Sequence, residues 1–147
     1  MCWKAYNRKD IKCHIAETDI RTFKILLLRK HTLHAYYKNY DYTIGKLNSV
    51  NSLELTGNNV FKGFHSYNLN NDCLSAVGGI VVQGKEGGFL DYYSRADHIV
   101  KVECTIPKGS EYYENSLGEI VSNKLIVDSI VYKFQNETKT EKIPILE

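Results

Sequence analysis

The chain has 147 residues, of which 43% are hydrophobic, and its 19 basic and 17 acidic side chains give a net charge of +2. This length suits one compact domain with a continuous core, and so small a charge disfavours a protein that coats extended nucleic acid. The longest apolar run, Ile25 to Leu28, is far shorter than the about 20 residues that cross a bilayer. Because no apolar signal region follows Met1, we expect a cytoplasmic protein with no membrane partner.

The cysteines and tyrosines limit the kinds of site that the chain can form. Cys2, Cys13, Cys73 and Cys104 are widely scattered, so we expect reduced thiols rather than a disulfide framework. Their spacing does not give the paired ligands of a metal site, and we predict neither a metal nor a cofactor. Tyrosine outnumbers phenylalanine by 11 to 5. Its flat ring and hydroxyl suit half-buried strands, and they also suit stacking on bases or on a partner surface.

The first half of the chain is rich in predicted strands. Apolar runs and turn residues predict extended segments over 22–29, 32–37, 40–44, 52–56 and 60–67. Arg29, Lys30 and His31 separate the first two and predict a hairpin turn. A short helix is predicted next: the polar run 68–72 can cap it, and 73–82 can form it, although Gly78 and Gly79 weaken this prediction. Residues 83–88 are rich in glycine, and we predict that they form either a mobile flap or an exposed connector.

The second half adds the clearest strand and its two successors. Residues 98–106 alternate and stop at Pro107, and strands are also predicted over 119–127 and 129–134. The fold class is therefore predicted as α+β and strand-dominated, with a compact antiparallel or mixed sheet and one or two short helices. Residues 1–135 form the single globular domain, and residues 136–147 form a polar C-terminal tail.

Candidate binding residues concentrate between the last predicted strands. Lys108 lies at a Pro-Lys-Gly corner that can bind an anion or form a solvated turn. Paired tyrosines follow, and polar side chains then interrupt an apolar strand. Such an interruption is expected where a sheet faces a ligand, and equally on an outward-facing edge strand. The candidates in this segment are Lys108, Tyr112, Tyr113, Asn115, Glu119, Ser122, Asn123 and Lys124.

His65 and Tyr67 form a second candidate pair. They are two residues apart, so on a strand both side chains project from one face. A histidine and a tyrosine on one face can hold a phosphate and stack on a base. The alternative is a histidine whose ring is hydrogen-bonded to a backbone carbonyl.

Several motifs carry a resemblance to known proteins. The chain resembles a family of small proteins of gut bacteria and their phages, through Met1-Cys2-Trp3, Gly63-Phe-His-Ser-Tyr67, Ile106-Pro-Lys-Gly-Ser110 with Tyr112-Tyr-Glu-Asn115, and Gly118-Glu-Ile-Val-Ser-Asn-Lys124. That resemblance implies a phage counter-defence context in a bacterial host cell, and it carries over no catalytic residue. Ile106-Pro-Lys-Gly109 with Glu119-Ile-Val121 is also similar to ADP-ribosyltransferase folds, but the Ser-Thr-Ser strand of those enzymes has no counterpart.

We therefore predict a binding protein that captures a nucleotide-type signal, such as a cyclic nucleotide, and that can form a homo-oligomer. Its ligand would contact His65, Tyr67, Tyr112 and Tyr113, with polar groups from Asn115 to Lys124. Two alternatives remain. One is an ADP-ribosyltransferase-like or nucleotide-cleaving enzyme with His65 as general base and Glu119 as orienting acid. The other is a protein-interaction module whose tyrosines form the interface.

Overall fold

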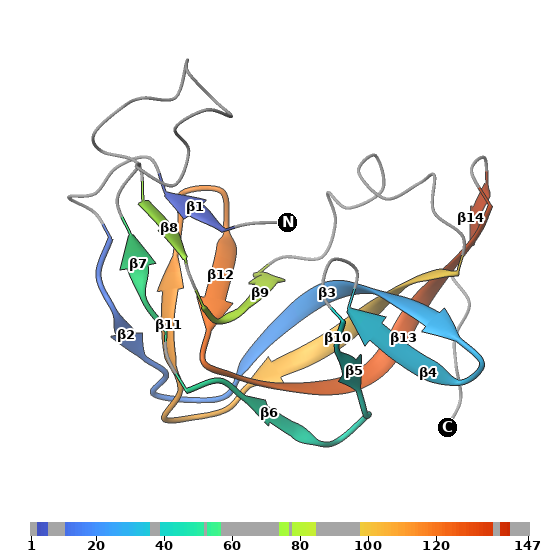
Figure 1. Ribbon diagram of the computed structural model, residues 1–147, viewed down its shortest axis with the longest axis horizontal. Coiled ribbons are helices and arrows are strands. Elements are labelled where there is room, and N and C mark those ends of the chain that lie inside the picture. Colours follow the sequence, from blue (N-terminus) through green and yellow to red (C-terminus); the bar gives the residue numbers. More distant parts are fainter. Residues whose placement is uncertain are drawn as a thin grey trace, which may run out of the picture.

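The structure is a computed structural model that describes residues 3–5, 11–35, 39–51, 53–56, 74–76, 78–84, 98–136 and 139–141 (Figure 1). These residues form strands and turns, and no helix occurs among them. The predicted α+β class is therefore wrong, because the described part of the chain is all β. Within this part no helix has the length and apolarity needed to cross a membrane.

The predicted helix over 73–82 is replaced by two strands, β8 (Leu74–Ala76) and β9 (Ile80–Gln83). Gly79 separates them with φ +98, and a Cβ atom there would lie 2.6 Å from side-chain carbons of both Leu53 and Val121. A helix interior offers neither this dihedral angle nor so close a contact. The run Ile80-Val-Val82 also favours a strand, because branched side chains pack well on a pleated surface.

Eleven strands form one antiparallel sheet, and three short strands form another. In the larger sheet the main order is β14 (Lys139–Glu141), β13 (Lys124–Asn136), β10 (Ile99–Ile106), β3 (Ile20–Arg29), β9, β12 (Glu119–Ser122), β11 (Glu111–Glu114) and β2 (His14–Ile15). The remaining strands are β4 (Thr32–Ala35), which pairs with β3 and with β5 (Asp41–Tyr42), and β6 (Leu47–Ser49), which pairs with β13. Strand β14 lies in the segment where a polar tail was expected.

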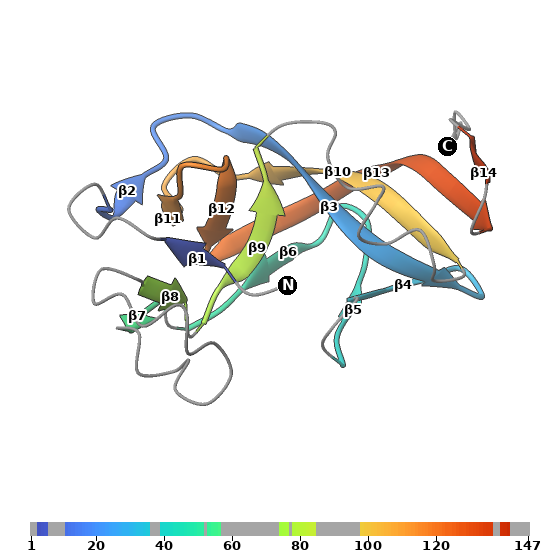
Figure 2. The ribbon, with the colours of Figure 1, turned by 90° about the horizontal axis from the view of Figure 1, so that it is seen from above.

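The chain itself connects strands of the larger sheet that are not neighbours in the ladder order. Strand β3 pairs with β9 and β10, β9 pairs with β12, and β12 leads through Asn123 into β13, which pairs with β10. The long strands β3, β10 and β13 run toward one end of the molecule, while β2, β11 and β12 lie at the other (Figures 1 and 2). The described strands of this sheet share one main core cluster, and no helix occurs among the described residues.

Strand alternation fills that interior. Along β10 the side chains of Val100, Val102, Cys104 and Ile106 are at most 1% exposed and belong to the main core cluster. The intervening positions point to the other face, as the period of two requires. The strand predicted over 98–106 is therefore confirmed. The same core cluster also contains residues of four other strands: Leu26 of β3, Ile80 and Val82 of β9, Ile120 of β12, and Leu125 and Val127 of β13.

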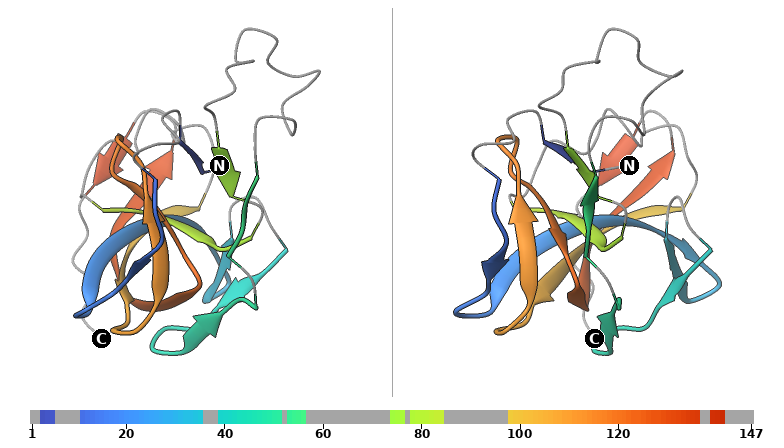
Figure 3. Two further views of the ribbon diagram at one scale, coloured as in Figure 1. Left: turned by 90° about the vertical axis from the view of Figure 1, so that its left-hand side faces the viewer. Right: turned by 60° about the vertical axis from the view of Figure 1, so that its left-hand side comes forward.

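A second cluster joins the two sheets. Strands β1 (Lys4–Ala5), β8 and β7 (Leu55–Thr56) lie next to β11 and β12 (Figures 1 and 3). Trp3 is 0% exposed and packs with Ala5 and Val121. Its indole Nε1 donates a hydrogen bond of 2.9 Å to the carbonyl oxygen of Glu119. The start of the described chain is therefore tied into the fold by both apolar and polar contacts.

Lys24 bridges β3 and β9 at the point where these two strands separate. Strand β3 pairs with β9 only between Phe23 and Gln83, and it pairs with β4 from Leu26 onward. Lys24 lies between these two ladders, and its Nζ donates a hydrogen bond of 2.6 Å to the carbonyl oxygen of Val81. The side chain thus supplies a bridge where the backbones of β3 and β9 diverge.

Candidate functional site

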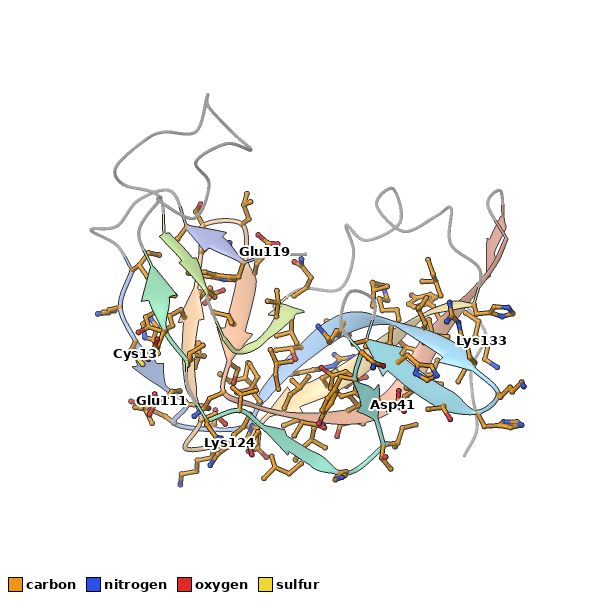
Figure 4. The ribbon with its side chains drawn as sticks, viewed as in Figure 1. Cys13, Asp41, Glu111, Glu119, Lys124 and Lys133 are labelled. Atoms are coloured by element: carbon orange, nitrogen blue, oxygen red, sulfur yellow. The ribbon has the colours of Figure 1, made fainter. Side chains whose placement is uncertain are left out.

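The hairpin of β11 and β12 carries half of the predicted binding residues, namely Tyr112, Tyr113, Asn115, Glu119 and Ser122 (Figure 4). Tyr112 is opposite Ser122 in the ladder, and Tyr113 is opposite Val121. Neighbouring residues of a strand project to opposite faces. Tyr112 accordingly packs against the main core cluster, whereas Tyr113 packs against the cluster of Trp3 and Val121. The two tyrosines were predicted to share a ligand, but the strand places them on different faces.

Asn115 organises the loop between these strands. It is 8% exposed, its Oδ1 accepts hydrogen bonds of 3.0 Å from the backbone N–H groups of Leu117 and Glu119, and its Nδ2 donates to Glu119 Oε1 at 2.9 Å. The backbone adds a bond from the N–H of Asn115 to the carbonyl of Glu119 at 3.0 Å. Asn115 and Glu119 are therefore engaged with each other, and they fix the shape of this turn.

Ser122, Asn123 and Lys124 form the bend between β12 and β13. The Ser122 side chain is fully buried, and its Oγ donates to the carbonyl of Lys124 at 2.9 Å and accepts from the Lys124 N–H at 3.2 Å. Asn123 Oδ1 accepts from the Glu111 N–H at 2.9 Å. The polar residues that interrupt the apolar strand thus form a bend, rather than a ligand-facing surface or an outward-facing edge strand. It also moves the strand break to Asn123 from the predicted position near Asp128.

Lys108 occupies the turn that joins β10 to β11. Its backbone N–H donates to Asp19 Oδ1 at 2.8 Å, and Ser110 Oγ donates to the carbonyl of Pro107 at 2.6 Å. Gly109 takes φ +90, which favours glycine at this corner. The Lys108 side chain is exposed, while the backbone around it is held by the turn.

Tyr113 has a thiol neighbour. Its ring lies 6.3 Å from that of Trp3, measured between centroids. Burial raises the pKa of the Tyr113 hydroxyl, and the Cys13 thiol beside it raises that pKa further. Cys13 and Cys104 are free thiols, the first exposed and the second buried, and burial raises the pKa of Cys104 to about 12.

His14 joins Tyr112 on the other face. The two residues are directly opposite in the ladder of β2 and β11. Their rings lie 5.2 Å apart between centroids, with 23° between the ring planes, which is a stacked arrangement. Lys12 is exposed and lies two residues before His14 in the chain. A histidine and a tyrosine are therefore stacked at the edge of the larger sheet, and an exposed lysine precedes them in the sequence.

This pair has the chemistry that the sequence suggested for His65 and Tyr67. Those two residues lie outside the described part of the chain, as do residues 85–88 of the predicted flap. His14 was not among the residues that the sequence predicted to bind a ligand. The available signal was a histidine within a short extended segment, but the partner strand is almost 100 residues away in sequence and no local pattern connects them. Among the described residues, no three His, Cys, Asp or Glu side chains form a group that suits a metal ion.

No protein-family model, curated protein or solved structure matches this chain. The similarity to proteins of gut bacteria and their phages, and that to ADP-ribosyltransferase folds, therefore depend on the motifs alone.

Proposed function

We propose that this chain binds a nucleotide-type small molecule at the stacked pair of His14 and Tyr112, and that it releases this ligand unchanged. The observation that carries the proposal is the stacking of these two rings at the edge of the larger sheet, 5.2 Å apart between centroids. Flat aromatic side chains at an accessible edge provide a surface on which a base can stack.

The neighbouring groups suit the rest of such a ligand. Lys12 is exposed two residues before His14 in the chain, and an ammonium group forms charge-assisted hydrogen bonds with phosphate oxygens. Stacking contributes about 1 to 3 kcal/mol per base in proteins that bind single-stranded nucleic acids. Capture of a nucleotide signal in phage counter-defence is the biological role that we propose on the basis of the family resemblance.

The catalytic alternative has less support. Its orienting acid, Glu119, accepts a hydrogen bond from Asn115 Nδ2 and uses its backbone carbonyl for Trp3. These contacts assign Glu119 to the loop and to the second cluster. We therefore propose binding without turnover.

Incubation with a panel of cyclic and linear nucleotides, followed by equilibrium dialysis, tests the proposal. We expect binding of at least one member, and about tenfold weaker binding after Tyr112→Leu, as loss of about 1.4 kcal/mol of stacking implies. Tyr113→Leu is the matched control, because it removes the same groups from the opposite face. Equal losses in both variants, or no binding by the unmodified protein, would contradict the proposed site.

Chromatography of the same mixtures separates binding from catalysis. The nucleotide recovered after heat denaturation should be identical to the nucleotide added. A converted nucleotide whose formation stops in Glu119→Gln would instead support the enzyme alternative and exclude simple capture.

A further inference from the structure

Basic side chains gather at the turn between β3 and β4. Arg29 ends β3, Lys30 and His31 form the turn, and all three side chains are exposed. His98 is also exposed and lies alongside, because its carbonyl oxygen accepts a hydrogen bond of 2.8 Å from the N–H of Leu28. We call Arg29, Lys30, His31 and His98 the basic tip. It lies at the end of the molecule opposite β2 and β11 (Figure 1).

The basic tip is not neutralised by the described part of the chain. No carboxylate of a described residue lies within ion-pair distance of Arg29, Lys30, His31 or His98. By contrast, Arg21 near the other end of β3 is paired with Glu103 at 2.6 Å, and His34 of β4 contacts Asp41. The tip therefore presents charge that is available to a partner.

The backbone of the basic tip is unusual as well. Lys30, His31 and His98 have φ values of 49°, 70° and 63°, and they are the only non-glycine residues with positive φ in the described ranges. A two-residue hairpin turn with both residues at positive φ favours Asn-Gly. For other L-residues the left-handed conformation is sterically unfavourable. Strain of this kind concentrates at functional sites, and here it coincides with exposed positive charge.

We propose that the basic tip binds the phosphate backbone of a nucleic acid. The net charge of +2 disfavours coating of a long strand, but it averages over an uneven distribution. Glu111, Glu114 and Glu119 lie on the β11–β12 hairpin at the other end, with Lys108 and Lys124 in the turn and bend that flank it, and at the end of the basic tip Lys133 is opposite Glu141 (Figure 4). Positive charge concentrated on one projecting element gives a local contact with phosphates.

The shape of the tip favours nucleic acid over an anionic membrane. A two-stranded antiparallel ribbon fits the major groove of duplex DNA, which is about 12 Å wide. Stable association with a lipid surface needs apolar side chains that enter the bilayer interface. Among the described residues the exposed large hydrophobic side chains are those of Ile15, Tyr40, Ile44, Leu47 and Leu117, and none of them belongs to the tip.

Fluorescence anisotropy with a labelled 20-base-pair duplex at about 50 mM salt tests this proposal. Binding should weaken about tenfold or more in Arg29→Gln/Lys30→Gln, and the slope of log K against log salt should become shallower by about 2, since each phosphate contact contributes about 0.9. Lys46→Gln/Lys108→Gln removes the same charge from exposed lysines elsewhere and should leave the affinity within about twofold of that of the unmodified protein.

Two further variants make the result specific. Lys30→Arg keeps the charge and should keep the affinity, provided that its circular dichroism matches that of the unmodified protein. Tyr112→Leu should leave duplex binding unchanged, so this proposal and the nucleotide site can fail separately. Absence of duplex binding, equal losses in both double variants, or binding to anionic vesicles but not to the duplex would overturn the assignment.

Discussion

The turn between β3 and β4 offers a direct test of whether function is kept at the expense of stability. Lys30 and His31 occupy its two central positions at φ 49° and 70°, and Arg29 pairs with Thr32 across it. Replacing them by Asn-Gly in Lys30→Asn/His31→Gly supplies the residues that this turn favours. The substitution changes no buried side chain, since both positions are exposed.

The expected gain follows from the two dihedral angles. Left-handed conformations cost residues other than glycine about 1 to 2 kcal/mol each, so glycine at position 31 removes about 1 to 2 kcal/mol of strain, and asparagine at position 30, which tolerates this conformation better than lysine, removes a further part. The greater freedom of glycine in the unfolded chain offsets about 0.5 to 1 kcal/mol of this gain. The free energy of unfolding should therefore rise by about 1 to 2 kcal/mol. For a chain of this size each kcal/mol raises Tm by about 2 to 4 °C.

Urea denaturation followed by circular dichroism measures this gain as a higher midpoint with an unchanged m value. Lys30→Ala/His31→Ala is the control, because it removes the same two side chains but keeps both Cβ atoms and hence the strain. We expect no comparable stabilisation in the control, and weaker duplex binding in both variants. If the Asn-Gly variant is no more stable than the Ala-Ala variant, the backbone at this turn is not strained and the reasoning is refuted.

Three other substitutions test what holds the fold. Asn115→Ala should lower the free energy of unfolding by about 1 to 3 kcal/mol in urea melts, because three hydrogen bonds to its buried side chain are lost. Trp3→Phe should cost about 1 to 2 kcal/mol in the same assay through loss of the hydrogen bond to the Glu119 carbonyl, and a neutral effect would show that this bond contributes nothing. Burial raises the pKa of Cys104 from 9.0 to about 12, so the folded state holds this proton more tightly than the unfolded state. Stability should then fall as pH rises above 9, by about 1.4 kcal/mol at pH 10, and the fall attributable to this thiol should be missing in Cys104→Val.

The sequence predicted those elements whose signal is local. Alternation over 98–106 identified β10, and the basic run Arg29-Lys30-His31 between apolar runs identified the β3–β4 hairpin. The helix prediction over 73–82 failed because mixed apolar content does not distinguish the two periods in so short a run. What decides against the helix is the approach of Leu53 and Val121 to Gly79, and this contact comes from distant parts of the chain.

The candidate site shows a related limit. Tyr112, Tyr113, Asn115 and Ser122 lie in one short segment of the sequence, and for that reason they were predicted to form one site. Successive side chains of a strand project to opposite faces, so the adjacent tyrosines lie on different faces of β11. Pairing of β2 with β11 then brought His14 to Tyr112. This pairing joins two segments that are far apart in the sequence, and no pattern within either short strand reveals it.

The distribution of charge, like the position of His14, depends on the fold and cannot be read from the total for the chain. A sum over the chain gives +2 and argues against a nucleic-acid partner only if the charges are spread evenly. The fold instead carries Glu111, Glu114 and Glu119 on one hairpin and the basic tip on another. Because interactions between exposed charges fade beyond about 8 to 10 Å at physiological salt, a partner at the tip is attracted mainly by the tip. The local charge at the basic tip, rather than the total charge of the chain, therefore determines whether this end of the protein attracts a nucleic acid.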